Sequence, residues 1–236
     1  MLKTKNVVIA CMLLVAVIIA AGITGHIDDM AQPASINTTG YPPVIIDAGH
    51  GGFDGGAVAN GITEKDINLA ISLNLRDMLT SSGFTVIMIR EEDISVHDPA
   101  ANTIRTKKNT DLNNRLKVIN ENNNAIFVSI HQNMYTESQY SGAQVFYSPN
   151  NESSKALAQI LQNTIVKQLQ NDNTRQIKEA TDSLFLLYNA EIPAVMVECG
   201  FLSNPEEAQK LNTDEYQQQM SFAIMCGILE YCSGSE

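Results

Sequence analysis

Short apolar runs of strand length alternate with amphipathic segments of helical length over most of the chain. The runs suit buried strands, and apolar positions three and four residues apart suit the inner face of a helix. We predict strands at Val44–Asp47, Phe84–Ile89, Ala125–Ile130, Ala143–Tyr147 and Ala194–Glu198, with Leu184–Tyr188 as a further candidate. We predict helices at Glu64–Thr80, Leu112–Asn122, Ser153–Gln170 and Asp214–Tyr231, and a polar loop at Glu91–Thr110. This alternation is typical of βαβ units, so the expected fold is α/β, a single domain with a mostly parallel twisted sheet flanked by helices on both faces.

The N-terminal segment has a different pattern. Lys3 and Lys5 precede an uncharged apolar run at Val7–Ile23, and a loose spacer follows at Gln32–Pro43. The run lies between the usual length of a signal-peptide core and that of a membrane span, so it is either a cleaved signal or an uncleaved anchor that holds the chain at the membrane. We predict a signal or anchor segment with its spacer at 1–43 and one globular domain at 44–236. The chain is then exported and extracytoplasmic, either secreted or membrane-tethered.

Composition and charge exclude some classes of function. The 236 residues are 44% hydrophobic and 17% charged, which suits one globular domain. The formal net charge is −11, so nucleic acid, which binds to basic surfaces, is not an expected partner. Cys226 and Cys232 face different sides of one predicted helix, and no Cys/His spacing typical of a structural metal occurs, so we expect free thiols.

Two of the four histidines fall at the ends of predicted strands. His50 follows the first strand in the glycine-rich stretch VIIDAGHGGFDGG, and His131 ends the strand in AIFVSIHQN. Glu198 ends the strand in AVMVECGFLSN, and Glu64 opens the helix after the glycine-rich loop, with Thr63 as its candidate cap. Because the carboxyl ends of parallel strands meet at one edge of a sheet, we expect these four titratable side chains to lie together.

Two imidazoles and a carboxylate are the usual protein ligands of a catalytic zinc ion, and a second carboxylate can then transfer protons. Each of these residues alone could have an ordinary structural role. The hypothesis of a zinc site therefore rests on their occurring together at one edge of the sheet. The glycines do not fit a dinucleotide motif, because Asp54 stands where the last glycine is required, and no Walker sequence follows. We expect His26 and His97 to be solvated surface residues.

Four stretches resemble, in order, the motifs of one enzyme family: DAGHGGFDGGAVANGITEKDINLA, MIREED, DLNNRLKVINENNNAIFVSIHQN and PAVMVECGFLSNPEEAQKL. From about Val44 to Tyr231 the chain is similar to the zinc-dependent N-acetylmuramoyl-L-alanine amidases of the type 3 family. Its short N-terminal segment and its lack of wall-binding repeats resemble the germination-specific members.

The resemblance implies the roles of individual residues. It implies that His50, Glu64 and His131 bind one zinc ion per chain and that Glu198 is the catalytic glutamate. Three further residues fall on motif positions, as support for the metal site or as substrate contacts: Asp47, Asn133 and Arg115. For Arg115 a structural ion pair is an equal alternative.

The reaction implied by the resemblance is hydrolysis of the amide between N-acetylmuramic acid and L-alanine in peptidoglycan. The implied setting is spore cortex processing for germination, with the domain at 44–236 as the catalytic domain facing the forespore or cortex. A zinc peptidase that cuts within stem peptides would use the same four residues, and a regulated wall-binding protein is the non-enzymatic alternative. Some family members carry an added helix that blocks the groove, but Ser153–Arg175 has room for little more than one helix, so self-inhibition is not expected. Any control of activity must then come from an outside partner, such as an accessory activator protein, or from the timing of expression.

Overall fold

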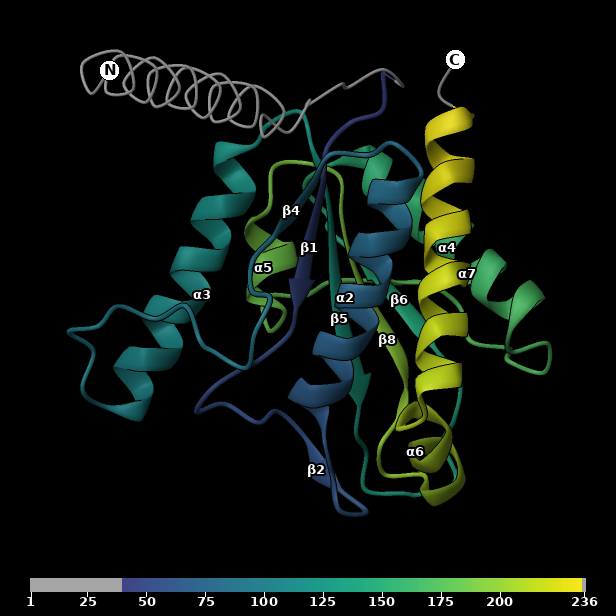
Figure 1. Cartoon of the computed structure of the whole chain (residues 1–236), viewed down its shortest axis with the longest axis horizontal. Helices are drawn as coiled ribbons and strands as arrows, with labels where there is room; N and C mark the ends of the chain where they lie inside the picture. Colours follow the sequence, from purple (N-terminus) through teal and green to yellow (C-terminus); the bar gives the residue numbers. More distant parts are fainter. Residues whose placement is uncertain (1–39, 235–236) are drawn as a thin grey trace, which may run out of the picture. The chain divides into compact units, whose positions relative to one another are not determined.

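The computed structural model describes residues 40–234 (Figure 1). The predicted signal or anchor segment lies outside the described residues. Among the helices of 40–234, none combines the length and the apolar character that a membrane span requires.

A six-stranded sheet forms the centre of the described domain (Figure 1). Its strands are β1 (Val44–Ala48), β4 (Val86–Met88), β5 (Ile126–Asn133), β6 (Gln144–Tyr147), β7 (Lys178–Glu179) and β8 (Ala194–Phe201), in the spatial order β4-β1-β5-β8-β6-β7. All neighbouring pairs are parallel except β6 and β8. Every residue of β1 is buried, which explains the uninterrupted apolar run that predicted it.

Helices cover both faces of the sheet. The elements on one face are α2 (Glu64–Ser81), α4 (Glu152–Gln168) and α7 (Asp214–Ser233), and those on the other are α3 (Ile104–Glu121) and α5 (Phe185–Asn189). Successive residues of a strand point to opposite faces of the sheet and so belong to different hydrophobic clusters. Ile46 lies in the cluster that contains Ile71 of α2, whereas Ile45 lies in the cluster that contains Ile119 of α3. The predicted α/β class and the mostly parallel sheet flanked on both faces are confirmed.

Two sequence predictions about local structure are wrong. The candidate strand Leu184–Tyr188 is the short helix α5, because an apolar run this short suits a buried helical turn as well as a strand, and α5 buries Leu186 and Leu187. The predicted loop Glu91–Thr110 ends early, because α3 begins at Ile104. Thr103 and Thr106 form a capping box there, each side chain accepting a hydrogen bond from the other's backbone amide.

Sequence reasoning also missed a helix and a two-stranded hairpin that carry clear local signals. Helix α6 (Pro205–Leu211) begins with Asn204 as N-cap and a proline in the first turn. Strands β2 (Val58–Ala59) and β3 (Ile62–Thr63) form a hairpin around Asn60 and Gly61, whose φ values of 53° and 76° suit a tight turn.

The remaining local predictions concern thiols and the region after β6. Cys199 is buried, and Cys226 and Cys232 are free thiols on α7. In the described chain from 152 to 177, α4 is the single helix, as the spacing of that region predicts.

Candidate active site

Side chains from two strand ends and one helix start meet at the carboxyl edge of the sheet. His50 follows β1, His131 lies in the adjacent β5, and Glu64 opens α2. One ligand atom from each residue lies within 4.8 Å of the other two. The histidine rings are edge to face with centroids 4.9 Å apart. The structure thus brings together the three residues predicted as metal ligands.

The Glu64 carboxylate lies between the two imidazoles. Its Oε1 is 2.9 Å from Nδ1 of His131, and its Oε2 is 3.3 Å from Nε2 of His50. Backbone amides of Ala57 and Gln132 also donate to it, at 2.8 and 3.1 Å. Burial opposes ionisation of Glu64, but the two histidines outweigh burial and hold the pKa of Glu64 well below its usual range. The buried carboxylate is therefore an anion at neutral pH.

Two glycines allow backbone to pass directly beside these ligands. A Cβ on Gly49 would lie 2.2 Å from Nε2 of His131, and a Cβ on Gly56 would lie 2.4 Å from Oε2 of Glu64. Side chains at these two positions would occupy the space that the ligands occupy. Close packing around the cluster thus explains two of the glycines in the stretch around His50.

The backbone of His50 is held in an uncommon conformation. Its φ is 61°, in the left-handed region, which for a non-glycine residue costs on the order of 1–3 kcal/mol. Two backbone hydrogen bonds between Gly51 and Asp54 close the loop after it, and Arg115 Nη2 donates to the His50 carbonyl at 2.7 Å. These contacts fix the direction in which the imidazole points.

Arg115 and Asp47 form a buried ion pair beneath the cluster. Arg115 Nε also donates to Asp111 at 2.6 Å, and the Ser129 hydroxyl donates to Asp47 at 2.7 Å. Burial opposes ionisation of Asp47, but Arg115, His131 and Ser129 outweigh burial and lower its pKa. The geometry supports the structural ion pair for Arg115 over a substrate contact. Asp47 supports the site through Arg115, without a hydrogen bond to either histidine.

Asp54 is a site residue that sequence reasoning missed. Its Oδ2 is 3.1 Å from Nδ1 of His50, which leaves Nε2 of that ring facing Glu64. Burial alone would lower the pKa of His50, but Asp54 and Glu64 outweigh it and raise this pKa to about 9. The Lys108 ammonium lies 3.2 Å from Oδ1 of the same aspartate. The available signal was a carboxylate four residues after a histidine in a tight loop.

Arg90, in the motif MIREED, is a second residue whose role was not predicted. Its buried guanidinium donates to the backbone carbonyls of Ala48, Gly49 and Lys65, at 2.8, 3.0 and 2.9 Å. It therefore ties the end of β1 to the start of α2, and with them the segments that carry His50 and Glu64.

Glu198 lies on β8 directly opposite His131 of β5. Side chains of paired residues project from the same face of a sheet, so the carboxyl group faces the cluster. Its Oε2 is buried and has no hydrogen-bond partner among the described residues. Burial, with a smaller contribution from Glu64, raises the pKa of Glu198 to about 7, although His131 and His50 oppose this shift. A carboxyl group with such a pKa can both accept and donate a proton near neutrality.

Three further predictions concern residues at or near the edge of the sheet. The Asn133 side chain makes no hydrogen bond within 40–234, and its backbone carbonyl accepts one from Leu202 at 2.8 Å. Thr63 stands at the N-cap of α2 as predicted, but its side chain makes no capping hydrogen bond. His97 is half-buried and packs edge to face against Phe53, which corrects its assignment as a solvated residue. His26 lies outside the described residues.

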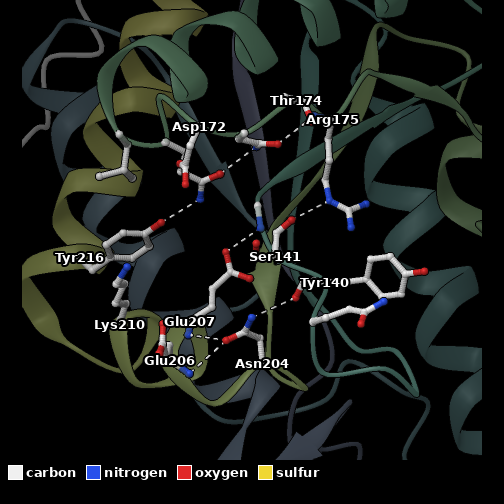
Figure 2. Close-up of a pocket in the computed structure, with 15 residues that line it drawn as sticks. Tyr140, Ser141, Asp172, Thr174, Arg175, Asn204, Glu206, Glu207, Lys210 and Tyr216 are labelled. Atoms are coloured by element: carbon white, nitrogen blue, oxygen red, sulfur yellow. Dashed lines mark hydrogen bonds between the residues drawn. The ribbon is translucent and has the colours of Figure 1, made fainter.

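A cavity of about 230 Å³ opens at the cluster. Both histidines line it, together with apolar walls from Phe53, Leu112 and Leu186. A larger cavity of about 480 Å³ lies between Tyr140 and Arg175 on one side and Tyr216 and Lys210 on the other (Figure 2). None of the four candidate residues of the cluster lines it. We therefore place the chemistry in the smaller cavity.

The donor set fits a divalent metal ion. Two ring nitrogens and one carboxylate oxygen converge, and the carboxylate is anionic. Catalytic zinc sites use such a set and leave one position open. An α/β sheet that holds this set beside a glutamate with a buried carboxylate oxygen has the arrangement of a metal-dependent hydrolase.

The family model for N-acetylmuramoyl-L-alanine amidases matches residues 44–230. The chain belongs to this family, so the prediction of an amidase that acts on peptidoglycan is confirmed.

Individual relatives confirm the narrower resemblance. The germination-specific N-acetylmuramoyl-L-alanine amidase of Bacillus subtilis is 35% identical over 204 residues, which cover 86% of this chain and 85% of that protein. The CwlD amidase from Clostridioides difficile, solved in complex with the GerS lipoprotein, has a TM-score of 0.79 and 42% identity, covering 82% of this chain and all of that one. The amidase AmiC2 of Nostoc punctiforme has a TM-score of 0.70 and 30% identity, covering 81% of this chain and 97% of that one.

Proposed function

We propose that this protein is a zinc-dependent amidase that cuts the bond between the lactyl group of N-acetylmuramic acid and L-alanine in spore cortex peptidoglycan, for germination. The observation that carries the proposal is the convergence of His50, Glu64 and His131, with Glu198 paired to His131 across the sheet. The similarity to a germination-specific amidase supports the cortex as the setting.

In this proposal His50, Glu64 and His131 hold the metal. A bound zinc ion would polarise the amide carbonyl and acidify water. Asp54 keeps the His50 ring oriented, and Arg115 and Arg90 hold the backbone on which the ligands stand.

Glu198 transfers the proton in the proposed reaction. Its carboxylate accepts a proton from the attacking water while the water oxygen bonds to the amide carbon. When the carbon–nitrogen bond breaks, Glu198 delivers this proton to the leaving nitrogen. The products are a lactyl carboxylic acid group on the sugar, which then ionises, and a free amino group on L-alanine.

We further propose that the domain acts outside the cytoplasm, held by its N-terminal segment or released from it, and that an accessory protein assists it. The support for a partner is the related C. difficile amidase, which was solved with a lipoprotein.

Product analysis tests the proposed reaction. The full chain is incubated with purified cortex peptidoglycan, and the N-termini of released peptides are sequenced. We expect alanine, and N-termini from within the stem peptide would indicate a peptidase instead.

His131→Ala should lose zinc, so undiminished zinc in that variant would contradict the ligand assignment. Glu191→Gln, an exposed change just before β8, is the matched control for changes in Glu198.

A further inference from the structure

A cationic group stands at the rim of the catalytic cavity of this acidic protein. Lys108 lines the same 230 Å³ cavity as His50 and His131, and its side chain is 51% exposed. It belongs to the start of α3, where Arg105 and Lys107 are also cationic and the positive end of the helix dipole adds to their field. The local charge at this wall is thus opposite to the net charge of −11 of the whole chain.

The acidic residues of the cavity are already paired. Asp47 and Asp111 both contact Arg115, and Asp54 is shared between His50 and Lys108. The carboxylates that line the cavity therefore do not leave an unpaired negative charge that would repel an anionic ligand.

Lys108 is the lining cation that keeps donors for a ligand. The other lining cation, Arg115, is buried and uses its guanidinium on Asp111, Asp47 and two backbone carbonyls. The ammonium group of Lys108 has three donors, and the contact described for it is with a single oxygen of Asp54. Lys107 beside it lies 5.6 Å from the ring centroid of Phe53, on the same rim.

Lys108 stands close to the candidate metal ligands, on the rim of the same cavity. The Asp54 carboxylate bridges the Lys108 ammonium and the candidate ligand His50. Its Oδ1 lies 3.2 Å from Lys108 Nζ, and its Oδ2 lies 3.1 Å from His50 Nδ1. Phe53, Leu112 and Leu186 form an apolar wall beside it that suits the methyl group of L-alanine. The second residue of a stem peptide carries its α-carboxyl group within about 7 Å of the scissile amide, as two residues of extended chain.

We propose that Lys108 is a specificity-determining residue that binds the α-carboxylate of the second stem-peptide residue, so the enzyme prefers stems in which this group is free over stems in which it is amidated. The inference rests on the proposed function and adds to it a preference for one charge state of the stem peptide. Lys107 contributes to the field but is not required for the contact.

Two synthetic muramyl tripeptides test the proposal. N-acetylmuramoyl-L-alanyl-γ-D-glutamyl-L-lysine and its D-isoglutaminyl counterpart differ in a single group, the α-carboxylate of the second residue, which is a carboxamide in the latter. Wild-type protein loaded with zinc should prefer the acid by roughly tenfold in kcat/KM, as expected for one partly exposed charge contact. Lys108→Met should bring this ratio close to one, whereas Lys108→Arg should keep most of it. Lys117→Met, an exposed change farther along α3, should leave the ratio unchanged.

The ratio separates substrate binding from support of the metal site. If Lys108 acts only by positioning Asp54, Lys108→Met will slow both substrates equally and keep the ratio, which overturns the proposal. Equal rates of the wild type on both substrates overturn it as well. If neither tripeptide is cut, the proposed function fails on these substrates, and calorimetric binding of the two tripeptides to the zinc-loaded protein still decides, since equal affinities would refute a role for Lys108.

Discussion

Replacing Gly49 with alanine should disturb the metal site through one steric contact. Gly49 does not have a positive φ, so its backbone can accept alanine without strain. The added Cβ would lie 2.2 Å from Nε2 and 2.3 Å from Cε1 of His131, whereas ordinary contacts begin near 3.4 Å. The ring must therefore move by about 1.2 Å, several times the roughly 0.2 Å within which metal–ligand distances hold.

We expect Gly49→Ala to weaken zinc affinity by at least about 100-fold, the upper end of losses seen when a residue supporting a metal ligand is removed. Overpacking should also cost about 1–3 kcal/mol of the free energy of unfolding. Competition with a fluorescent chelator measures the affinity, and thermal unfolding of the metal-free protein measures the stability. Gly55→Ala is the matched control, because in the same loop its Cβ would meet only two methyl groups, of Thr63 at 3.3 Å and of Val58 at 3.9 Å. Wild-type zinc affinity in Gly49→Ala would refute the packing argument.

Three further predictions address the proton shuttle, pH and substrate charge. Glu198→Gln should lower turnover by about 10²- to 10⁴-fold while zinc content stays at the wild-type level, and retained activity would reject the shuttle. Because the pKa of His50 is raised to about 9, a metal must displace a proton below that pH, so zinc affinity should fall about tenfold per pH unit on acidification. Asp54→Asn should move this dependence to lower pH, and an affinity independent of pH would contradict it. The net charge of −11 should repel walls dense in anionic polymer, so stripping that polymer from one peptidoglycan should raise the rate at low salt, with no difference at high salt. Equal rates in all four conditions would remove this argument.

The sheet and the clustering of the candidate metal ligands could be predicted because buried strands leave continuous apolar runs and because chemistry gathers at their carboxyl ends. His50 and His131 were found for this reason, as residues that follow or end such runs. Helix α5 could not be predicted in the same way, since an apolar run as short as Leu184–Tyr188 fits a strand or a buried helix turn equally well.

The supporting residues of the site were harder to predict than its ligands. Asp54 and Arg90 act through hydrogen bonds whose partners depend on the fold of a loop and on a contact between distant segments. Asp54 lies only four residues from His50 in the sequence, but the pattern of apolar and polar residues does not indicate that this loop folds back on the histidine. Arg90 bonds the backbone of Gly49, 41 residues away, and such a contact follows only from the strand order.

The sheet sets the distances between the residues of the candidate site, and this has a consequence for how the enzyme can diversify. His131 and Glu198 are paired residues of β5 and β8, which stand at the fixed interval of neighbouring strands, about 4.8 Å, and His50 follows the end of β1, the other neighbour of β5. The connection between β5 and β8's other neighbour β6, at 134–143, lies outside these strands and takes no part in this spacing. Exchanging this connection between family members should thus produce chimaeras that keep their affinity for zinc.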